Sequence, residues 1–299
     1  VVSDYPFVTE TSRHLVDAGG KRFRPLLTLL ASHFGPRPAN DDVIKAAVVV
    51  ELTHLATLYH DDVMDEAQLR RGAPSANARW DNSVAILTGD FLFARASDIL
   101  ADLGPEAVRI QAQTFERLCT GQIREAVGPD DGIDPVKHHL QVLSDKTGSL
   151  IATAGRFGAM MAGAEASTID TLSRFGEAIG VAFQLADDIV DITSDAEQSG
   201  KLPGTDLREG VPTLATLIAQ ATDQSGDDAL VAFLSGPIPD DADHARALRL
   251  LREHPALEDA RDEARRWAGD ARRILEPLPA GDAKLALEAL CDYVVNRTG

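Results

Sequence analysis

Three aspartates lie close together in Thr53–Arg71 (THLATLYHDDVMDEAQLRR): Asp61, Asp62 and Asp65. Asp61 and Asp65 are four residues apart, so in a helix their carboxylates lie on one face, one above the other. Two like charges at that spacing repel and weaken the helix unless a cation lies between them. A small group of hard oxygen ligands suits Mg²⁺, which shares its remaining positions with water and substrate phosphates. The stretch therefore predicts a magnesium site.

The same pattern returns in FQLADDIVDI as Asp187, Asp188 and Asp191. A single cluster of this kind could be a solvated acidic helix face. Two clusters, each inside an apolar helical run, are difficult to explain as surface. Arg70 and Arg71 directly follow the first cluster, and the planar guanidinium group fits phosphate oxygens. We therefore expect the two carboxylate faces to act together on a diphosphate.

The composition limits the partners. The 299 residues carry a net charge of -18, which argues against nucleic acid and against a polybasic attachment to anionic lipid. A phosphate-bearing substrate must then be bound by local Lys and Arg side chains or by metal. Cys119 and Cys291 lack metal-ligand spacing and are expected to be reduced core residues of a cytoplasmic protein.

Membrane and targeting segments are not expected. The longest apolar run, VIKAAVVVEL, carries Lys45 and Glu51, so we expect no membrane span and no stable membrane insertion. No signal peptide is visible. The chain begins abruptly at Val1, shortly before residues with predicted roles, so a preceding segment is expected to be missing.

Helical periodicity dominates the chain, and no convincing alternating strand is found. Ser83–Leu103 and Pro105–Val127 are expected to be long helices. Asp134 and Pro135 are expected to start another helix, which breaks near Lys146-Thr147-Gly148 and resumes. No low-complexity linker divides the chain, so residues 1–299 are expected to form one all-α domain of roughly ten to twelve helices. This domain would be a helical bundle around a deep central cavity.

Five sequence pieces occur in the order found in trans-isoprenyl diphosphate synthases: GGKRFRP, DDVMD followed by RRG, KTG, FQLADDIVD and GKLPGTDLREGVPTL. The resemblance extends from Gly19 to about Leu214, and the ordered set is far more specific than any single piece. The amino-acid sequence around the first cluster resembles most the bacterial long-chain polyprenyl diphosphate synthases. The resemblance implies the all-α isoprenoid synthase fold, a homodimer, and a magnesium-dependent prenyltransferase that joins isopentenyl diphosphate to an allylic diphosphate.

The resemblance also implies roles for single residues. It assigns metal binding, directly or through water, to six carboxylates: Asp61, Asp62, Asp65, Asp187, Asp188 and Asp191. About three Mg²⁺ ions are expected with the bound diphosphate. Catalysis is assigned to three of these carboxylates and two lysines: Asp61, Asp65, Asp187, Lys146 and Lys201.

Two substrate sites follow from the same matches. Isopentenyl diphosphate is expected on four side chains: Lys21, Arg24, His54 and Arg71. The allylic diphosphate is expected on five: Arg70, Lys146, Thr147, Gln184 and Lys201. Arg22 lies one step off the Lys21–Arg24 face and is expected to be a solvated neighbour.

Taken singly, these residues also have structural interpretations. Lys21 and Arg24 could stabilise a helix C-terminus, and His54 could be a hydrogen-bonded core histidine. Lys146 could mark a simple helix interruption, and Lys201 could be an ordinary loop lysine.

Ala56 bears on product length. It lies five residues before Asp61, roughly 7 Å along a helix axis at about 1.5 Å per residue. Short-chain relatives often carry a bulky aromatic residue at this position. The alanine predicts an elongation tunnel that continues past it and a product longer than geranylgeranyl diphosphate, and the resemblance implies about C30 to C50. The alternative is that Ala56 packs against a neighbouring helix, with a geranylgeranyl or farnesyl diphosphate product.

Two other classes of protein fit these motifs less well. A class I terpene cyclase ordinarily lacks both the second DDxxD cluster and the GGKRFRP piece. A non-catalytic partner subunit of a heteromeric synthase usually loses aspartates, whereas both clusters are complete here.

Overall fold

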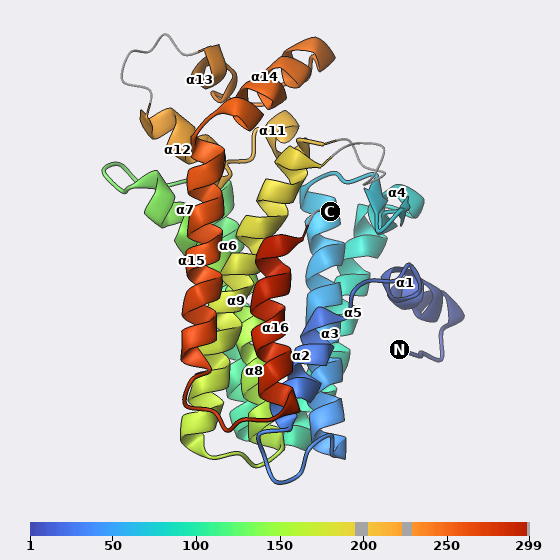
Figure 1. Cartoon of the computed structure of the whole chain (residues 1–299). Coiled ribbons are helices and arrows are strands. Elements are labelled where there is room, and N and C mark those ends of the chain that lie inside the picture. Colours follow the sequence, from blue (N-terminus) through green and yellow to red (C-terminus); the bar gives the residue numbers. More distant parts are fainter. Residues whose placement is uncertain (195–202, 223–228, 298–299) are drawn as a thin grey trace. The chain divides into compact units, whose positions relative to one another are not determined.

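The computed structural model describes residues 1–194, 203–222 and 229–297 (Figure 1). These residues are helical almost throughout, which confirms the all-α prediction, and they contain more helices than the ten to twelve expected. One small departure is an antiparallel pair of two-residue strands, β1 (Leu69–Arg70) and β2 (Ala73–Pro74). The chain divides into two compact units, which we describe separately: Val1–Phe115 with Thr153–Ser173, and Glu116–Ala152 with Arg174–Gly299.

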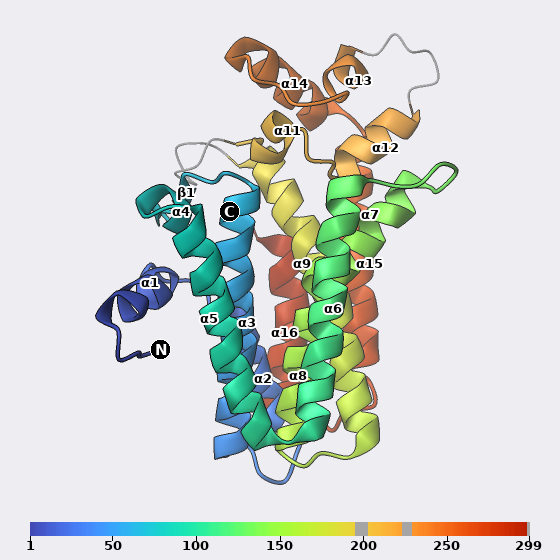
Figure 2. The ribbon, with the colours of Figure 1, turned by 180° about the vertical axis from the view of Figure 1, so that it is seen from behind.

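The first unit is organised around two long helices that lie side by side, α3 and α5 (Figures 1 and 2). Besides the strands, its elements are α1 (Pro6–Asp17), α2 (Phe23–Ser32), α3 (Asp41–Met64), α4 (Ala76–Arg79) and α5 (Asn82–Leu103). Three helices contribute residues to both units: α6 (Pro105–Val127), α8 (Ser149–Met161) and α9 (Ala166–Thr193).

Helix α3 carries the first aspartate cluster at its C-terminal end. The Asn40 side chain caps its start by accepting hydrogen bonds from the backbone N–H groups of Asp42 (2.9 Å) and Val43 (3.2 Å). Near the other end, the hydroxyl of buried Tyr59 donates to the carbonyl of Thr11, which ties α3 to α1. The helix that carries the first aspartate cluster is therefore fixed near both of its ends.

The length of α3 corrects one expectation. The helix has 24 residues and a window of mean hydropathy 1.2, so by length and composition alone it could cross a membrane. More than half of that window is buried inside the protein, as in the core helix of a folded domain. The prediction that no apolar stretch reaches spanning length is therefore wrong for the whole helix.

The second unit contains the remaining elements: α7 (Pro135–Leu143), the π-helical turn η1 (Ser144–Gly148), α11 (Thr205–Glu209), α12 (Leu214–Thr222), α13 (Ala229–Phe233), α14 (Asp241–Glu253), α15 (Ala256–Ile274) and α16 (Asp282–Asn296). Its core joins Val181, Leu185 and Ile192 of α9 to apolar residues of α12, α14 and α15. This packing positions the helix that carries the second aspartate cluster.

The expected helix break at Lys146-Thr147-Gly148 is instead a π-helical turn. Asp134 caps α7 through the backbone N–H of Val136 (2.9 Å), as predicted. Leu143 and Ser149 on either side of the turn both have right-handed helical backbone angles. The chain thus stays helical from α7 through η1 to α8, with one wider turn. Turns of this kind are rare and often occur at functional sites.

The two cysteines differ in burial. Cys291 is buried in α16, as expected for a core residue, and it donates a hydrogen bond to the Leu287 carbonyl. Cys119 is exposed on α6, so the prediction that it is a core residue is wrong.

Candidate functional site

The first aspartate cluster lies where α3 ends. Asp61 is half-buried in the last turn, and the Asp65 backbone N–H donates to its carbonyl (2.8 Å). Asp65 is the C-cap residue, still in the right-handed helical region, and its side chain is 55% exposed. The helical spacing of Asp61 and Asp65 predicted from the sequence is therefore present.

Asp62 points into the protein rather than to its surface. It is fully buried, and its Oδ1 accepts a hydrogen bond from the Arg70 Nε (2.6 Å). Its Oδ2 has no hydrogen-bond partner among the described residues. Burial raises the pKa of Asp62, while Arg70 acts in the opposite direction. The carboxylate of Asp62 thus holds Arg70 beside the cluster, where the Arg70 Nη2 lies 4.0 Å from Asp65 Oδ2.

Arg71 is fixed against the loop that contains GGKRFRP. Its Nη1 donates to the carbonyls of Leu15 (2.7 Å) and Gly19. The guanidinium lies so near Gly20 that a Cβ there would come within 2.8 Å of the Arg71 Cζ. Gly20 also has a positive φ of 129°, so glycine is required for both space and backbone conformation.

Four arginines and a histidine gather in the first unit. Arg24 is half-buried, and its buried Nε has no hydrogen-bond partner among the described residues. Burial, opposed by Glu51 and reinforced by Arg71, lowers the pKa of Arg24 to about 10. Burial and the charges of the arginines, Arg24 first, lower the pKa of His54 well below its usual value. The sequence prediction that Arg24, His54 and Arg71 belong together is thus matched by their placement.

Arg22 also belongs to this group, which contradicts the expectation of a solvated neighbour. Its Nη1 donates to Glu51 and its Nη2 to the Val16 carbonyl (2.6 Å). Its backbone is left-handed, with φ 49°, and this conformation turns the side chain inward at the start of α2. Spacing on a regular helix could not reveal that turn. Lys21, next to it, is exposed.

In the second unit, side chains of the π turn and α9 form a short chain of contacts. The Thr147 hydroxyl donates to the Gln184 Oε1 (3.2 Å), and the Gln184 Nε2 donates to Asp188 Oδ1 (3.0 Å). Lys146 Nζ pairs with Glu125 of α6 at 2.5 Å. Three of the five residues predicted for the allylic diphosphate thus lie beside the second cluster. Arg70 belongs to the first unit, and Lys201 lies outside the described residues.

Asp187 has a partner that sequence reasoning missed. Its carboxylate forms an ion pair with Arg297, whose guanidinium lies 4.5 Å from the centre of the Phe183 ring. The Arg297 side chain is only 8% exposed, and its Nη1 is buried without a hydrogen-bond partner in the described structure. The sequence near Arg297 has no motif or periodic signal that could have revealed this contact.

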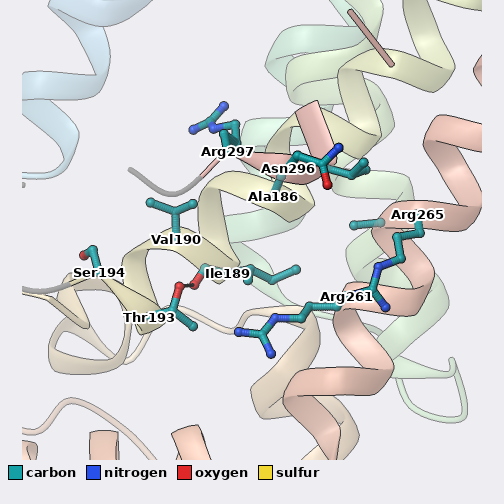
Figure 3. A pocket seen from close by; sticks show the side chains of 11 residues that line it. Ala186, Ile189, Val190, Thr193, Ser194, Arg261, Arg265, Asn296 and Arg297 are labelled. Atoms are coloured by element: carbon teal, nitrogen blue, oxygen red, sulfur yellow. Dashed lines mark hydrogen bonds between the residues drawn. The ribbon is translucent and has the colours of Figure 1, made fainter. Parts of the chain in front are cut away.

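Figure 3 shows the side chains that line a cavity beside α9. The volume of this cavity is about 390 Å³. Its lining combines apolar α9 residues such as Ile189 and Val190 with Arg261 and Arg265 of α15. Both arginines pair with Glu258, and Arg265 also pairs with Asp262. Arg297 borders the cavity, but its guanidinium extends away from Arg261 and Arg265 (Figure 3).

Three carboxylates lie near each other at the end of α9 and in α11: Asp188, Asp191 and Asp206. Burial, and next the charge of Asp206, raise the pKa of Asp188 to about 7. Burial and the charge of Asp191 raise the pKa of Asp206 to about 7. The Asp191 Oδ2 accepts a hydrogen bond from the Asp206 backbone N–H (3.2 Å), which holds α11 against the end of α9.

The donor chemistry fits a hard divalent cation. Within the described residues, no group of three or more Asp, Glu, His or Cys side chains is close enough to hold a metal as they stand. Burial and the repulsion of neighbouring carboxylates nevertheless raise the pKa values of Asp188 and Asp206. A divalent cation would relieve this repulsion, and oxygen ligands of this kind suit Mg²⁺.

Ala56 is fully buried in the first unit. A Cβ on Gly89 of α5 would lie 3.1 Å from the Ala56 carbonyl oxygen, so the backbones of α3 and α5 approach closely here. Both interpretations of Ala56 remain compatible with this placement, since the contact involves its carbonyl group rather than its methyl group.

The pKa of Asp188 gives a testable pH dependence. Because its folded-state pKa is raised from 3.8 to about 7, the folded protein holds a proton there that the unfolded chain releases. The contribution of Asp188 to stability therefore falls as pH rises through this window. In EDTA, Asp188→Asn should gain a few kcal/mol relative to the parent protein between pH 5 and pH 8. Paired denaturant titrations at both pH values measure this, and an unchanged difference would contradict it.

The chain is similar to known proteins over nearly its whole length. The Polyprenyl synthetase family model matches residues 5–251. The chain is 53% identical over 294 residues to a nonaprenyl diphosphate synthase of Mycobacterium tuberculosis, covering 98% of this chain and 87% of that protein.

Solved structures give the same result. A geranylgeranyl pyrophosphate synthase from Corynebacterium glutamicum, complexed with calcium and isoprenyl diphosphate, is 50% identical at TM-score 0.86 and covers 99% of this chain and 91% of its own. A decaprenyl diphosphate synthase from Rhodobacter capsulatus is 33% identical at TM-score 0.90, covering 100% of this chain and 92% of its own. These matches confirm the family resemblance and the all-α fold, and the chain belongs to the polyprenyl synthetase family.

Proposed function

We propose that this chain is a magnesium-dependent trans-prenyltransferase that condenses isopentenyl diphosphate with an allylic diphosphate. Its proposed product is a linear polyprenyl diphosphate. We further propose one functional domain over residues 1–299, a homodimer, and a cytoplasmic location without stable membrane insertion. The family match supports the single domain, because it extends over parts of both compact units.

The observation that carries the proposal is the arginine cluster of the first unit. The buried Nε of Arg24 has no hydrogen-bond partner in the part of the chain that the structure describes, and Arg71 and His54 lie in the same positive field. A protein with a net charge of -18 gains no solubility from such a cluster. Buried cations of this kind require an anion, and a diphosphate supplies several oxygens for their forked donors. Lys21, Arg24, His54 and Arg71 are therefore proposed to bind isopentenyl diphosphate.

We propose that three carboxylates bind Mg²⁺ directly: Asp61, Asp65 and Asp187. The other three, Asp62, Asp188 and Asp191, are proposed to act through water molecules or through hydrogen bonds to the direct ligands. The Corynebacterium relative solved with calcium and isoprenyl diphosphate supports a divalent cation, and about three Mg²⁺ ions are proposed with the bound diphosphate. Bound there, Mg²⁺ would stabilise the negative charge that gathers on the departing diphosphate.

The chain's own residues would act on the two substrates as follows. Arg70, Lys146, Thr147, Gln184 and Lys201 would bind and orient the allylic diphosphate, whose carbon–oxygen bond breaks to give an allylic cation and inorganic diphosphate. The double bond of isopentenyl diphosphate then forms the new carbon–carbon bond, and a proton is lost to restore a double bond. The neutral imidazole of His54 can bind the second diphosphate without adding charge.

The test is turnover of the purified protein alone. Labelled isopentenyl diphosphate should enter product when a farnesyl or geranylgeranyl diphosphate primer and Mg²⁺ are present. A terpene cyclase would consume the primer without incorporating label, and a non-catalytic partner subunit would do neither. Mass spectrometry of the product identifies its length in the same assay.

Product length is the finer part of the proposal. The relatives from Mycobacterium and Rhodobacter are named nonaprenyl and decaprenyl diphosphate synthases, which supports a product of about C30 to C50. The Corynebacterium relative is named a geranylgeranyl pyrophosphate synthase, so a shorter product is the alternative.

Ala56→Tyr tests the tunnel directly. A ring in the path of the growing chain should shorten the product while the first condensation continues. Overfilling a buried position should also lower stability by about 1–3 kcal/mol. Product mass spectrometry beside a thermal melt measures both effects. If the folded variant makes a product of parental length, Ala56 only packs against its neighbours.

A further inference from the structure

Side chains of the π-helical turn η1 extend in two directions and contact different groups of residues. Lys146 and Thr147 extend toward Glu125 and Gln184, next to the second aspartate cluster. Ser144 and Asp145 extend instead into a network of charged side chains from α6 and α9. The proposed function uses the first pair only, so the role of the second pair is unassigned.

Asp145 is the centre of that network. Its side chain is 6% exposed, and both of its oxygens are used. Oδ1 accepts from the Arg117 Nε (3.0 Å), and Oδ2 accepts from the Arg124 Nη1 (2.5 Å) and the Gln141 Nε2 (3.0 Å). A buried carboxylate with three donors from two helices fixes its own position closely.

The network also binds the first residue of the turn. The Arg117 Nη2 donates to the Ser144 hydroxyl oxygen (3.1 Å) and to the Glu177 Oε1 (2.8 Å). The Ser144 hydroxyl donates to the same Glu177 oxygen (2.6 Å). Two carboxylates thus face two guanidinium groups, and the charges balance within the cluster.

Backbone packing restrains the turn from the side of α6. A Cβ on Gly121 would lie 2.8 Å from the Lys146 backbone nitrogen and 3.0 Å from the Asp145 Cβ. Only a glycine allows α6 to approach the turn so closely without a shift. The turn is therefore held by charge through Asp145 and by direct contact through Gly121.

We propose that Asp145 is a positioning residue, which together with Arg117 and Arg124 holds the π turn so that Lys146 and Thr147 face the allylic diphosphate. This inference rests on the proposed function for the identity of the substrate. π-helical turns are rare compared with α-helical ones, and here the side-chain contacts of Asp145 and Ser144 hold the turn in place. A displacement of about 1 Å in groups that bind a reacting substrate can reduce a rate by up to about a hundredfold.

Two variants disturb the turn by independent routes. Asp145→Asn keeps the shape but removes the charge that binds both guanidinium groups, and Gly121→Ala displaces the turn backbone. Each should raise the KM for the allylic diphosphate about tenfold and leave the KM for isopentenyl diphosphate unchanged. Matched controls are Glu258→Gln, an exposed carboxylate that also binds two arginines, and Gly269→Ala, where a Cβ meets open space. Both controls should keep parental values.

A second readout does not require turnover. Hydrogen–deuterium exchange should become faster at Ser144–Gly148 in Asp145→Asn and Gly121→Ala and stay unchanged in the controls. If the parental protein fails to incorporate isopentenyl diphosphate, the proposed function is wrong, while exchange still tests the hold on the turn. Equal changes in both KM values, or parental KM values in folded variants, would overturn the inference. If Asp145→Asn does not fold, Gly121→Ala and the milder Arg124→Gln decide it.

Discussion

Replacing Asp61 by asparagine is expected to lower kcat by about a hundredfold at saturating Mg²⁺ and substrates. The change removes one ligand charge at the place where negative charge gathers on the departing diphosphate. Loss of one such electrostatic interaction costs about 3 kcal/mol in the transition state, which corresponds to about this factor. Steady-state turnover with labelled isopentenyl diphosphate measures it. Asp98→Asn on α5, a 71% exposed aspartate, is the matched control and should keep the parental kcat.

Asp187→Asn should have an effect of similar size, but its interpretation differs. The variant also removes the partner of Arg297, so a buried guanidinium loses its counter-charge. We therefore expect a loss of stability in addition to the loss of kcat, which a thermal melt separates from the kinetic effect. A parental kcat in either Asp61→Asn or Asp187→Asn would refute the proposed metal ligands.

Arg71→Ala is expected to raise the KM for isopentenyl diphosphate by about thirtyfold or more. Hydrogen bonds between charged groups contribute about 1.5–3 kcal/mol each, and the forked guanidinium can make two to a diphosphate. The same guanidinium binds the carbonyls of Leu15 and Gly19, so the variant should also be less stable. Lys21→Ala provides the cleaner comparison, because Lys21 is exposed, and its KM effect should come without a change in melting temperature.

Arg70 supplies the contrast between the two substrates. Its replacement should mainly impair the allylic diphosphate, but Arg70→Ala would leave the buried Asp62 carboxylate without its cation. Arg70→Lys keeps the charge and removes the fork, so it is the more informative variant. Varying each substrate in turn measures the partition, and equal effects of Arg70 and Arg71 variants on both KM values would contradict it.

Elements with strong local signals could be predicted from the sequence. Pro105–Val127 was predicted to the residue, and the Asp134 cap of α7 follows from Asp-Pro chemistry. The grouping of Arg24, His54 and Arg71 followed from family motifs rather than from periodicity. Such motifs fix which residues share a site, because the chemistry of one substrate requires them together.

Other features depend on contacts between distant residues or on unusual backbone conformations. The left-handed φ of Arg22 brings its side chain to Glu51, and helical spacing assumes a right-handed backbone. Arg297 reaches Asp187 across more than a hundred residues of sequence, with no pattern to mark the pair. The π turn was mistaken for a break because Gly148 weakens a helix, whereas side chains of two other helices maintain this one.

The π turn also limits which insertions and deletions the α7–η1–α8 segment can tolerate. A π turn accommodates one residue more than an α-helical turn, so deleting one residue there would allow a regular α-helix to form. Each residue in an α-helix advances about 100° around the axis, at 3.6 residues per turn. A one-residue deletion would therefore be sterically easy for the backbone, yet it would remove the bulge from which Lys146 and Thr147 project. Functional variants should consequently keep the number of residues in Ser144–Gly148 as strictly as they keep the residues themselves.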